Sequence, residues 1–227
     1  MGVGPDVVPW RSLQLENGAN VVYTKSGYVA DLPETLTRLG MGGRTELRVS
    51  TSNWGYSSDG SGAKMQFEDV TVGVKVGLTH ANHLMMQSVL YQTSFPTGGD
   101  LLTTGSVDPS GTLIWAQMAK GWNVVENVGA LWTTEDGVRR TSFLPGIAVA
   151  HPLTKKTGFW AEYAPVVSAG GSMVHIVDGG FTYNLSNVRQ LDTRVGVERD
   201  ASGVHNIASV GYTFRLDGLG GRRGRVE

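Results

Sequence analysis

Five charged residues near the start of the chain have the types and spacing of an ion-pair cluster: Glu16, Glu34, Arg38, Glu46 and Arg48. In an extended chain, residues two apart share a face. Paired strands lie about 4.8 Å apart, so charges on one face of three successive strands must meet. An arginine offers five donors and can bind two acids. We therefore predict a mixed-sign cluster in which Arg38 and Arg48 each face a carboxylate from a neighbouring strand.

Two interpretations of this cluster use the same residues. The charges could form a constriction that selects which solutes pass through a lumen. Alternatively, they could neutralise one another and fill a narrow interior, because unpaired charges away from bulk water are costly.

Catalytic and metal-binding patterns are weak. Ser172 and His175 share one strand end and His205 lies at another, but there is no nucleophile elbow and no aspartate is tied to these histidines by spacing. His80 and His83 have metal-compatible spacing without a third ligand nearby. We predict no catalytic residue, no metal and no cofactor. The chain has no cysteine, and its net charge of −1 gives no reason to expect nucleic acid as a partner.

The elements that must position these side chains are strands. In LQLENGANVVY, Leu13, Leu15, Val21 and Tyr23 share one face, and similar alternation recurs along the chain between turn signals. The pattern predicts about 12 strands, near residues 12–24, 32–41, 44–55, 64–78, 83–95, 111–121, 123–134, 138–151, 157–167, 172–184, 187–199 and 204–216.

The length of these strands favours a membrane barrel over a soluble sandwich. Most span about 9 to 15 residues, whereas soluble strands average about 5 or 6 and a strand crossing a bilayer needs about 9 to 11. Their polar faces carry small residues and single charges of both signs, which suits a hydrated lumen. Besides the cluster, the residues expected to face the lumen are Asp69, Lys75, Glu162, Asp192, Arg194 and Arg215. The predicted fold is all-β: a closed antiparallel transmembrane β-barrel.

Aromatic residues fall at both ends of the predicted strands, as interfacial girdles do. One set is Tyr23, Trp54, Phe95, Trp115 and Trp132, and the opposite set is Trp122, Phe159, Trp160, Tyr183, Tyr212 and Phe214. Two polar residues, Glu126 and His175, interrupt faces that otherwise look outward.

With both termini on one side, the turns on that side are short, and the other side has a long connection at 97–111. This is the outer-membrane arrangement of short periplasmic turns and longer outer loops. We divide the chain into a periplasmic segment at 1–11, the barrel at 12–216 and a polar tail at 217–227. The start has no basic region followed by an apolar core, so we expect a mature form whose signal peptide is absent.

The closing stretch GYTFRL resembles the signal that outer-membrane barrels present to the barrel-assembly machinery. The matching residues are Gly211, Tyr212, Phe214 and Leu216, although such signals usually end the chain and here a tail follows. The resemblance implies that this machinery is a partner, together with outer-membrane lipid.

Several segments resemble the outer-membrane barrel family named for the MetA pathway of phenol degradation. They are VVPWRSLQLENGANVVYT, ADLPETLTRLGMGGRTELRV, SFPTG and the closing GYTFRL. The resemblance implies residence in the bacterial outer membrane and passage of small hydrophobic or aromatic molecules, and it supplies no catalytic residues. We therefore expect a narrow channel or transporter for a small-molecule solute rather than an enzyme. The alternatives are a closed structural barrel and a rim enzyme that hydrolyses lipid.

Overall fold

The computed structural model describes residues 3–51, 54–59, 62–79, 84–100, 102–135 and 137–220. All regular structure within these ranges is β-strand. None of the described residues forms a helix of the length and hydrophobicity that a membrane span requires. The strand segments are β1 (Leu13–Tyr23), β2 (Tyr28–Gly42), β3 (Thr45–Thr51), β4 (Trp54–Asp59), β5 (Gly62–Phe67), β6 (Val70–Gly77), β7 (Met85–Phe95), β8 (Asp108–Ala119), β9 (Trp122–Glu135), β10 (Val138–Pro152), β11 (Thr157–Tyr163), β12 (Val166–Ser168), β13 (Met173–Ser186), β14 (Arg189–Arg199) and β15 (Val204–Leu216).

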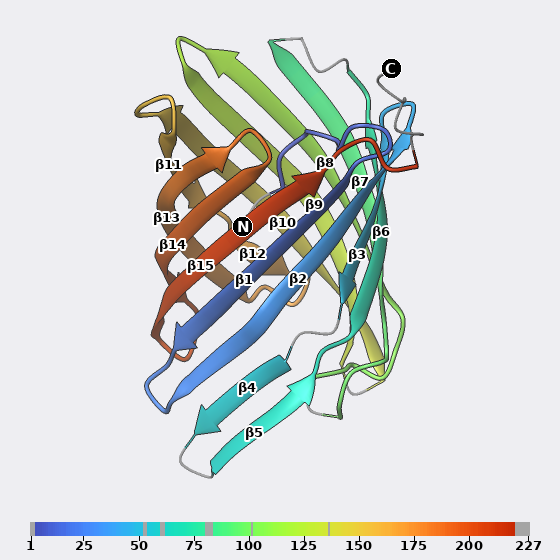
Figure 1. Cartoon of the computed structure of the whole chain (residues 1–227). Coiled ribbons are helices and arrows are strands. Elements are labelled where there is room, and N and C mark those ends of the chain that lie inside the picture. Colours follow the sequence, from blue (N-terminus) through green and yellow to red (C-terminus); the bar gives the residue numbers. More distant parts are fainter. Residues whose placement is uncertain are drawn as a thin grey trace, which may run out of the picture.

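These segments form one antiparallel sheet that closes on itself (Figure 1). Closure occurs where the first strand pairs with the last, from Leu13 opposite Leu216 to Tyr23 opposite Asn206. The end of β15 and the start of β1 therefore lie at the same rim. The predicted fold class, a closed antiparallel barrel of the transmembrane type, is confirmed.

Three wall strands are each divided into two segments, so the described segments occupy twelve positions around the barrel. One divided strand consists of β3 and β4, which both pair with β2. The next consists of β6, which pairs with β3, and β5, which pairs with β4. The third consists of β11 and β12, which both lie between β10 and β13. The predicted boundaries need small corrections, because β2 begins at Tyr28 rather than 32 and β8 at Asp108 rather than 111. Both strands extend into stretches whose turn-forming residues masked the alternation.

The two faces of the wall have opposite chemistry. Side chains on the outer face are apolar and exposed, among them Val195 at 66% and Phe181 at 61%. The inner face buries Glu46, Lys75 and Ser88 almost completely. A soluble barrel has the reverse arrangement, whereas a wall surrounded by lipid needs an apolar exterior.

The chain before β1 folds into the barrel, where backbone groups of Gly4, Asp6 and Val8 bond to side chains of the inner face. Its last residues pair with β2: the Arg11 amide donates to the Gly40 carbonyl at 3.1 Å, and the Gly40 amide donates to the Ser12 carbonyl at 2.9 Å. A Cβ atom at position 40 would lie 1.9 Å from the Pro9 carbonyl oxygen. Glycine at this position therefore lets the N-terminal segment, defined here as residues 3–11, lie directly against the wall.

Candidate functional site

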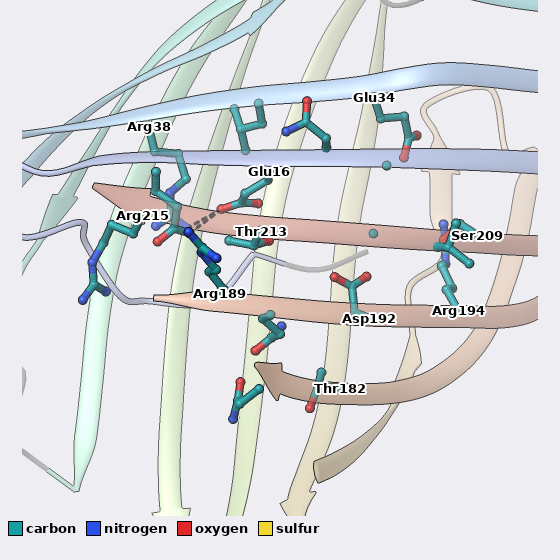
Figure 2. Close-up of a pocket in the computed structure, with 18 of the residues that line it drawn as sticks. Glu16, Glu34, Arg38, Thr182, Arg189, Asp192, Arg194, Ser209, Thr213 and Arg215 are labelled. Carbon is teal, nitrogen blue, oxygen red and sulfur yellow. Dashed lines mark hydrogen bonds and ion pairs between the residues drawn. The ribbon is translucent and has the colours of Figure 1, made fainter. Parts of the chain in front are cut away.

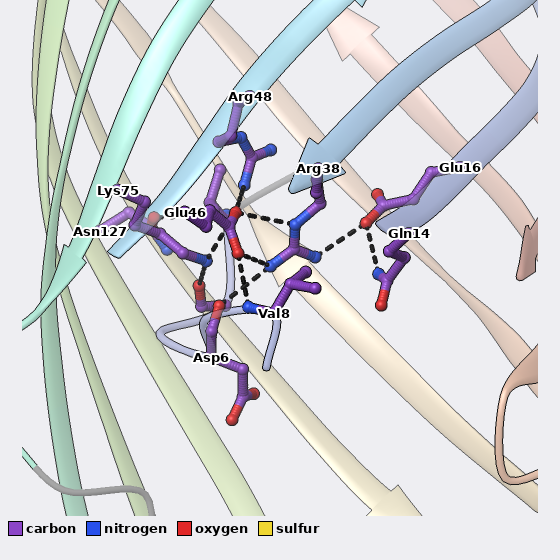
Figure 3. A network of polar contacts seen from close by, with 11 residues as sticks. Asp6, Val8, Gln14, Glu16, Arg38, Glu46, Arg48, Lys75 and Asn127 are labelled. Carbon is purple, nitrogen blue, oxygen red and sulfur yellow. Dashed lines mark hydrogen bonds and ion pairs between the residues drawn. The ribbon is translucent and has the colours of Figure 1, made fainter. Parts of the chain in front are cut away.

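The interior is organised around one carboxylate, that of Glu46 on β3 (Figure 3). This side chain is fully buried and accepts hydrogen bonds from Arg38 Nε at 2.8 Å and Arg48 Nη1 at 3.2 Å. The Val8 backbone amide donates to its second oxygen at 2.8 Å. Lys75 Nζ lies 3.8 Å away. A buried carboxylate is stable only with such partners, so Glu46 is the centre of the network.

Arg38 joins three parts of the molecule. Its Nη1 donates to Glu16 of β1 at 2.8 Å, its Nε and Nη2 hold Glu46, and Nη2 also donates to the Asp6 carbonyl at 3.0 Å. A guanidinium suits this role because its donors diverge in one plane. Alternation predicted that Arg38 faces carboxylates from neighbouring strands, and it lies between two of them, Glu16 and Glu46.

Arg48 and Lys75 complete the cluster, and their partners in it were not predicted from sequence. Arg48 contacts Glu46 two residues away on its own strand, rather than an acid on a neighbouring strand, so that expectation is corrected. Lys75, on β6, is 1% exposed and donates to the Gly4 carbonyl at 2.9 Å. We define the Glu46 cluster as Glu16, Arg38, Glu46, Arg48 and Lys75.

The Glu46 cluster holds the N-terminal segment mainly by its backbone. The Val8 amide, the Asp6 carbonyl and the Gly4 carbonyl each bond to a cluster side chain. The Val3 amide also donates to Asn127 of β9 at 3.3 Å. Backbone groups away from water need such partners. The cluster therefore replaces the hydrogen bonds that the segment would otherwise make to water.

Glu34 does not join this cluster, contrary to expectation. On β1, the residue opposite Glu34 is not a base but Gly18. Gly18 in turn lies opposite Gly211 of β15, and Gly211 lies opposite Asp192 of β14. The Glu34 carboxylate lies 3.2 Å from the position that a Cβ of Gly18 would take, and the Asp192 carboxylate lies 2.5 Å from that of Gly211. Two acidic side chains thus lie against two glycines, Gly18 and Gly211, where the first and last strands pair. We call these two residues the glycine floor. Along the described chain, neither has a hydrogen bond or ion pair.

Beside this floor lies a cavity of about 770 Å³. Figure 2 shows side chains converging on it from β1, β2 and β13 to β15. Most of the residues that line it are polar, with a few apolar side chains such as Leu36 and Val188 among them. The lining includes the lumen residues predicted from sequence on this side of the barrel, namely Glu16, Glu34, Arg38, Glu162, Asp192, Arg194 and Arg215. Hydroxyls and amides fill the spaces between these charges, as with Thr182, Asn184 and Ser209.

Two residues of this side were missed or misplaced at the sequence level. Trp160 was predicted to lie in an outer girdle, but it faces the lumen. It shares the inward face of β11 with Glu162. Trp160 is the one aromatic residue among those that line the cavity. Asp178 on β13 is buried and binds Arg194 through Nε at 2.7 Å. Alternation along β13 could have identified it, since Asp178 follows the outward Val177 and shares a face with Val174 and Ile176.

Asp69 occupies a different place from that expected. It lies in the break between β5 and β6, and its carboxylate accepts hydrogen bonds from the amides of Thr97 and Gly98 and from the Thr103 hydroxyl. It therefore fixes the long connection between β7 and β8. At the opposite rim, hydrogen bonds from Arg215 and then Ser12 hold the pKa of Asp217 below its usual range.

The histidines form local contacts. Nε2 of His205 lies 3.0 Å from Ser202 Oγ and 3.2 Å from Asp200 Oδ1. A catalytic triad uses both ring nitrogens, whereas these contacts involve Nε2 alone. The three residues therefore stabilise the turn between β14 and β15. Hydrogen bonds led by that of the Ser202 hydroxyl lower the pKa of Asp200 to about 2.

His175 stacks on Tyr163, with its Nδ1 2.9 Å from the phenolic oxygen. His80 and His83 lie outside the described residues. Within the ranges that the structure describes, no three acids or histidines gather as a metal site.

At the closing strand, Tyr212 and Phe214 lie side by side with ring centroids 5.9 Å apart. Gly211 faces the opposite way, under Asp192. The residues of the suggested assembly signal are therefore divided between the two faces of the wall.

A family model described as "Putative MetA-pathway of phenol degradation" matches residues 2–216. The chain belongs to this family. Among curated proteins, none matches the chain.

Several solved structures share the fold. An outer membrane channel from Pseudomonas putida F1 has a TM-score of 0.71 at 14% identity, with 95% of this chain and 100% of that chain covered. The NanC porin has a TM-score of 0.66 at 10% identity, covering 89% and 100%. The translocator domain of the autotransporter NalP from Neisseria meningitidis has a TM-score of 0.57 at 11% identity, covering 93% and 90%.

Proposed function

We propose that this protein is an outer-membrane channel for small molecules, and that its solutes are hydrophobic or aromatic. The observation that carries this proposal is the cavity beside β1 and β13 to β15, which has the size of a small-molecule site. Solved channels and porins with the same fold support the channel role. The apolar outer face supports residence in lipid, and the closing strand supports recognition by the barrel-assembly machinery.

The class of solute is suggested by Trp160. Its indole lines a cavity whose other walls carry hydroxyls, amides and charges. Aromatic rings bind flat apolar groups by stacking, while neighbouring polar groups fix orientation. The family description, which refers to phenol degradation, agrees with a ring-containing solute.

One test compares uptake of phenol with uptake of cyclohexanol, which has a similar size but no aromatic ring, into liposomes containing the protein. We expect faster entry of phenol and loss of that preference in Trp160→Ala. Trp122→Ala is the matched control, because Trp122 lies at the outer face of β9, near Phe159. Equal entry of both solutes through the unaltered protein would contradict an aromatic preference while leaving the channel role intact.

A closed structural barrel is the second candidate, and the N-terminal segment favours it. The segment and the Glu46 cluster occupy the lumen beside β2, β3 and β6. Planar-bilayer recordings separate the two functions. A channel gives discrete steps, and removal of residues 3–9 should enlarge them. If neither the whole chain nor the shortened chain conducts, the barrel is structural.

A lipid-hydrolysing role has little support. Ser172 is not among the hydrogen-bond partners of His175, whose Nδ1 contacts Tyr163 instead. We propose that the protein is not an enzyme. Lipid hydrolysis that disappears in Ser172→Ala or His175→Ala would contradict this.

A further inference from the structure

At the rim opposite the termini, polar side chains interrupt the apolar outer face. Among those described, Tyr163, His175 and Arg199 lie on the neighbouring strands β11, β13 and β14. Their neighbours on this face are valines, with Val177 51% and Val197 41% exposed. His175 is the third residue of β13 and Arg199 the last of β14, so both lie where the wall ends. Polar groups on a lipid-facing surface are less costly at this level, where headgroups begin, than deeper in the bilayer.

The two basic residues stand side by side without an acid. His175 lies directly opposite Arg199 in the strand register. Arg199 has no ion pair or hydrogen bond from its side chain along the described chain. The neighbouring Asp200 carboxylate is turned into its own loop, where it accepts bonds from Ser202 and Gly203. Bases directly opposite each other repel when both are charged, so an anion between them would be stabilising.

Tyr163 orients the imidazole of His175 so that it can donate a hydrogen bond to such an anion. Its phenolic oxygen is 2.9 Å from Nδ1, and the two rings are stacked at 17°. When the phenol donates to Nδ1, the other nitrogen of a neutral imidazole carries the proton. Nε2–H then serves as a donor even without a charge on the ring. Arg199 adds a permanent charge and a planar pair of donors that match phosphate oxygens.

We propose that Tyr163, His175 and Arg199 form a binding site for a phosphate group of lipid A, the phosphorylated glycolipid of the outer leaflet. The apolar band of valines below the site would lie against the acyl chains, and the basic pair would hold the phosphate at the headgroup level. The inference rests on the proposed outer-membrane location, with the rim opposite the termini facing outward. It does not depend on whether the barrel conducts.

The test is native mass spectrometry of the full chain in detergent, with lipid A, dephosphorylated lipid A or phosphatidylglycerol added. We expect one lipid A to bind, with dephosphorylated lipid A and phosphatidylglycerol markedly weaker. Arg199→Gln and His175→Ala should each weaken binding about tenfold, because each removes a charge-assisted hydrogen bond. Tyr163→Phe should weaken it about threefold, since only the orientation of the imidazole is lost.

Arg140→Ala is the matched control. Arg140 lies at the same rim and is similarly exposed, but it is already paired with Glu135 at 2.8 Å. Its removal should leave lipid A binding unchanged. Heat-modifiable gel migration would show that each variant forms the barrel. The proposal is overturned if Arg199→Gln binds like the unaltered chain or if Arg140→Ala weakens binding equally. Phosphatidylglycerol binding as tightly as lipid A would overturn it too. Because binding is measured without transport, a silent channel leaves this result standing.

Discussion

On one side of the lumen, beside β2, β3 and β6, the Glu46 carboxylate contacts two guanidiniums and a backbone amide of the N-terminal segment. On the other side, beside β1 and β13 to β15, Glu34 and Asp192 lean over two glycines next to a cavity. Both regions place carboxylates on inward strand positions. They differ in whether the carboxylate forms an ion pair with a base. The paired carboxylate of Glu46 holds the N-terminal segment, whereas the carboxylates of Glu34 and Asp192, unpaired within the described chain, line the cavity.

Among the substitutions that compare the two regions, Glu46→Gln should cause the largest loss of stability. The substitution leaves Arg38, Arg48 and Lys75 crowded together with no fully buried acid between them. Removing one partner of a buried ion pair is strongly destabilising, and we expect a loss of about 3 kcal/mol in the free energy of unfolding. Urea unfolding of the folded barrel in detergent would measure it. Any conductance should shift toward anions. A change below about 0.5 kcal/mol would mean that the cluster does not hold the interior together.

Arg38→Ala tests the same side from the basic partner. Glu46 keeps Arg48 and the Val8 amide, so we expect a smaller loss, about 2 kcal/mol. Because a positive charge is removed, conductance should rise and ion preference should move toward cations, opposite in sign to the shift in Glu46→Gln. Reversal potentials in a salt gradient would record both shifts. If both variants move the reversal potential in the same direction, the cluster does not lie on the permeation path.

Gly40→Ala perturbs the packed side through shape alone. The new methyl would overlap the Pro9 carbonyl, so the N-terminal segment must move. We expect a loss of about 1 to 2 kcal/mol, in the range of overpacked sites, and longer or larger open states in bilayer recordings. Gly111→Ala is the control, because a Cβ at that strand position meets nothing within 4 Å. Similar recordings from the two variants would show that the overlap with Pro9 does not matter.

Glu34→Gln and Asp192→Asn should have the smallest effect on stability, within about 0.5 kcal/mol, because neither acid has a partner to lose. Each should reduce cation preference measured in a salt gradient. The pairing of Glu34→Gln with Glu46→Gln applies the same chemical change to the open and the packed side. Equal destabilisation by the two would remove the distinction between them.

Much of the wall was predictable from sequence because alternation is a local signal. Val195 and Val197 point outward and Arg194 inward, as a period of two requires. The contact of Arg38 with Glu16 and Glu46 also followed from alternation together with strand order.

Other features depended on register and on the path of irregular chain. Glu34 shares a face with Arg38, but it lies opposite Gly18 rather than a base, and only the pairing register decides this. The N-terminal segment has no periodicity that could place it, and its bonds to Lys75 and Asn127 join residues far apart in the chain. Trp160 was misplaced because aromatic residues at strand ends usually face lipid, and its inward direction depends on one step of register along β11.

The glycine floor also bears on the order in which the barrel forms. Gly18 and Gly211 lie on the first and last strands, so their pairing belongs to the final step that joins the two edges of the sheet. Before that step, Glu34 on β2 and Asp192 on β14 are at opposite ends of an open sheet. Joining the edges places one acid on each side of the paired glycines. The glycine floor, with an acid on each side, therefore exists only in the closed barrel.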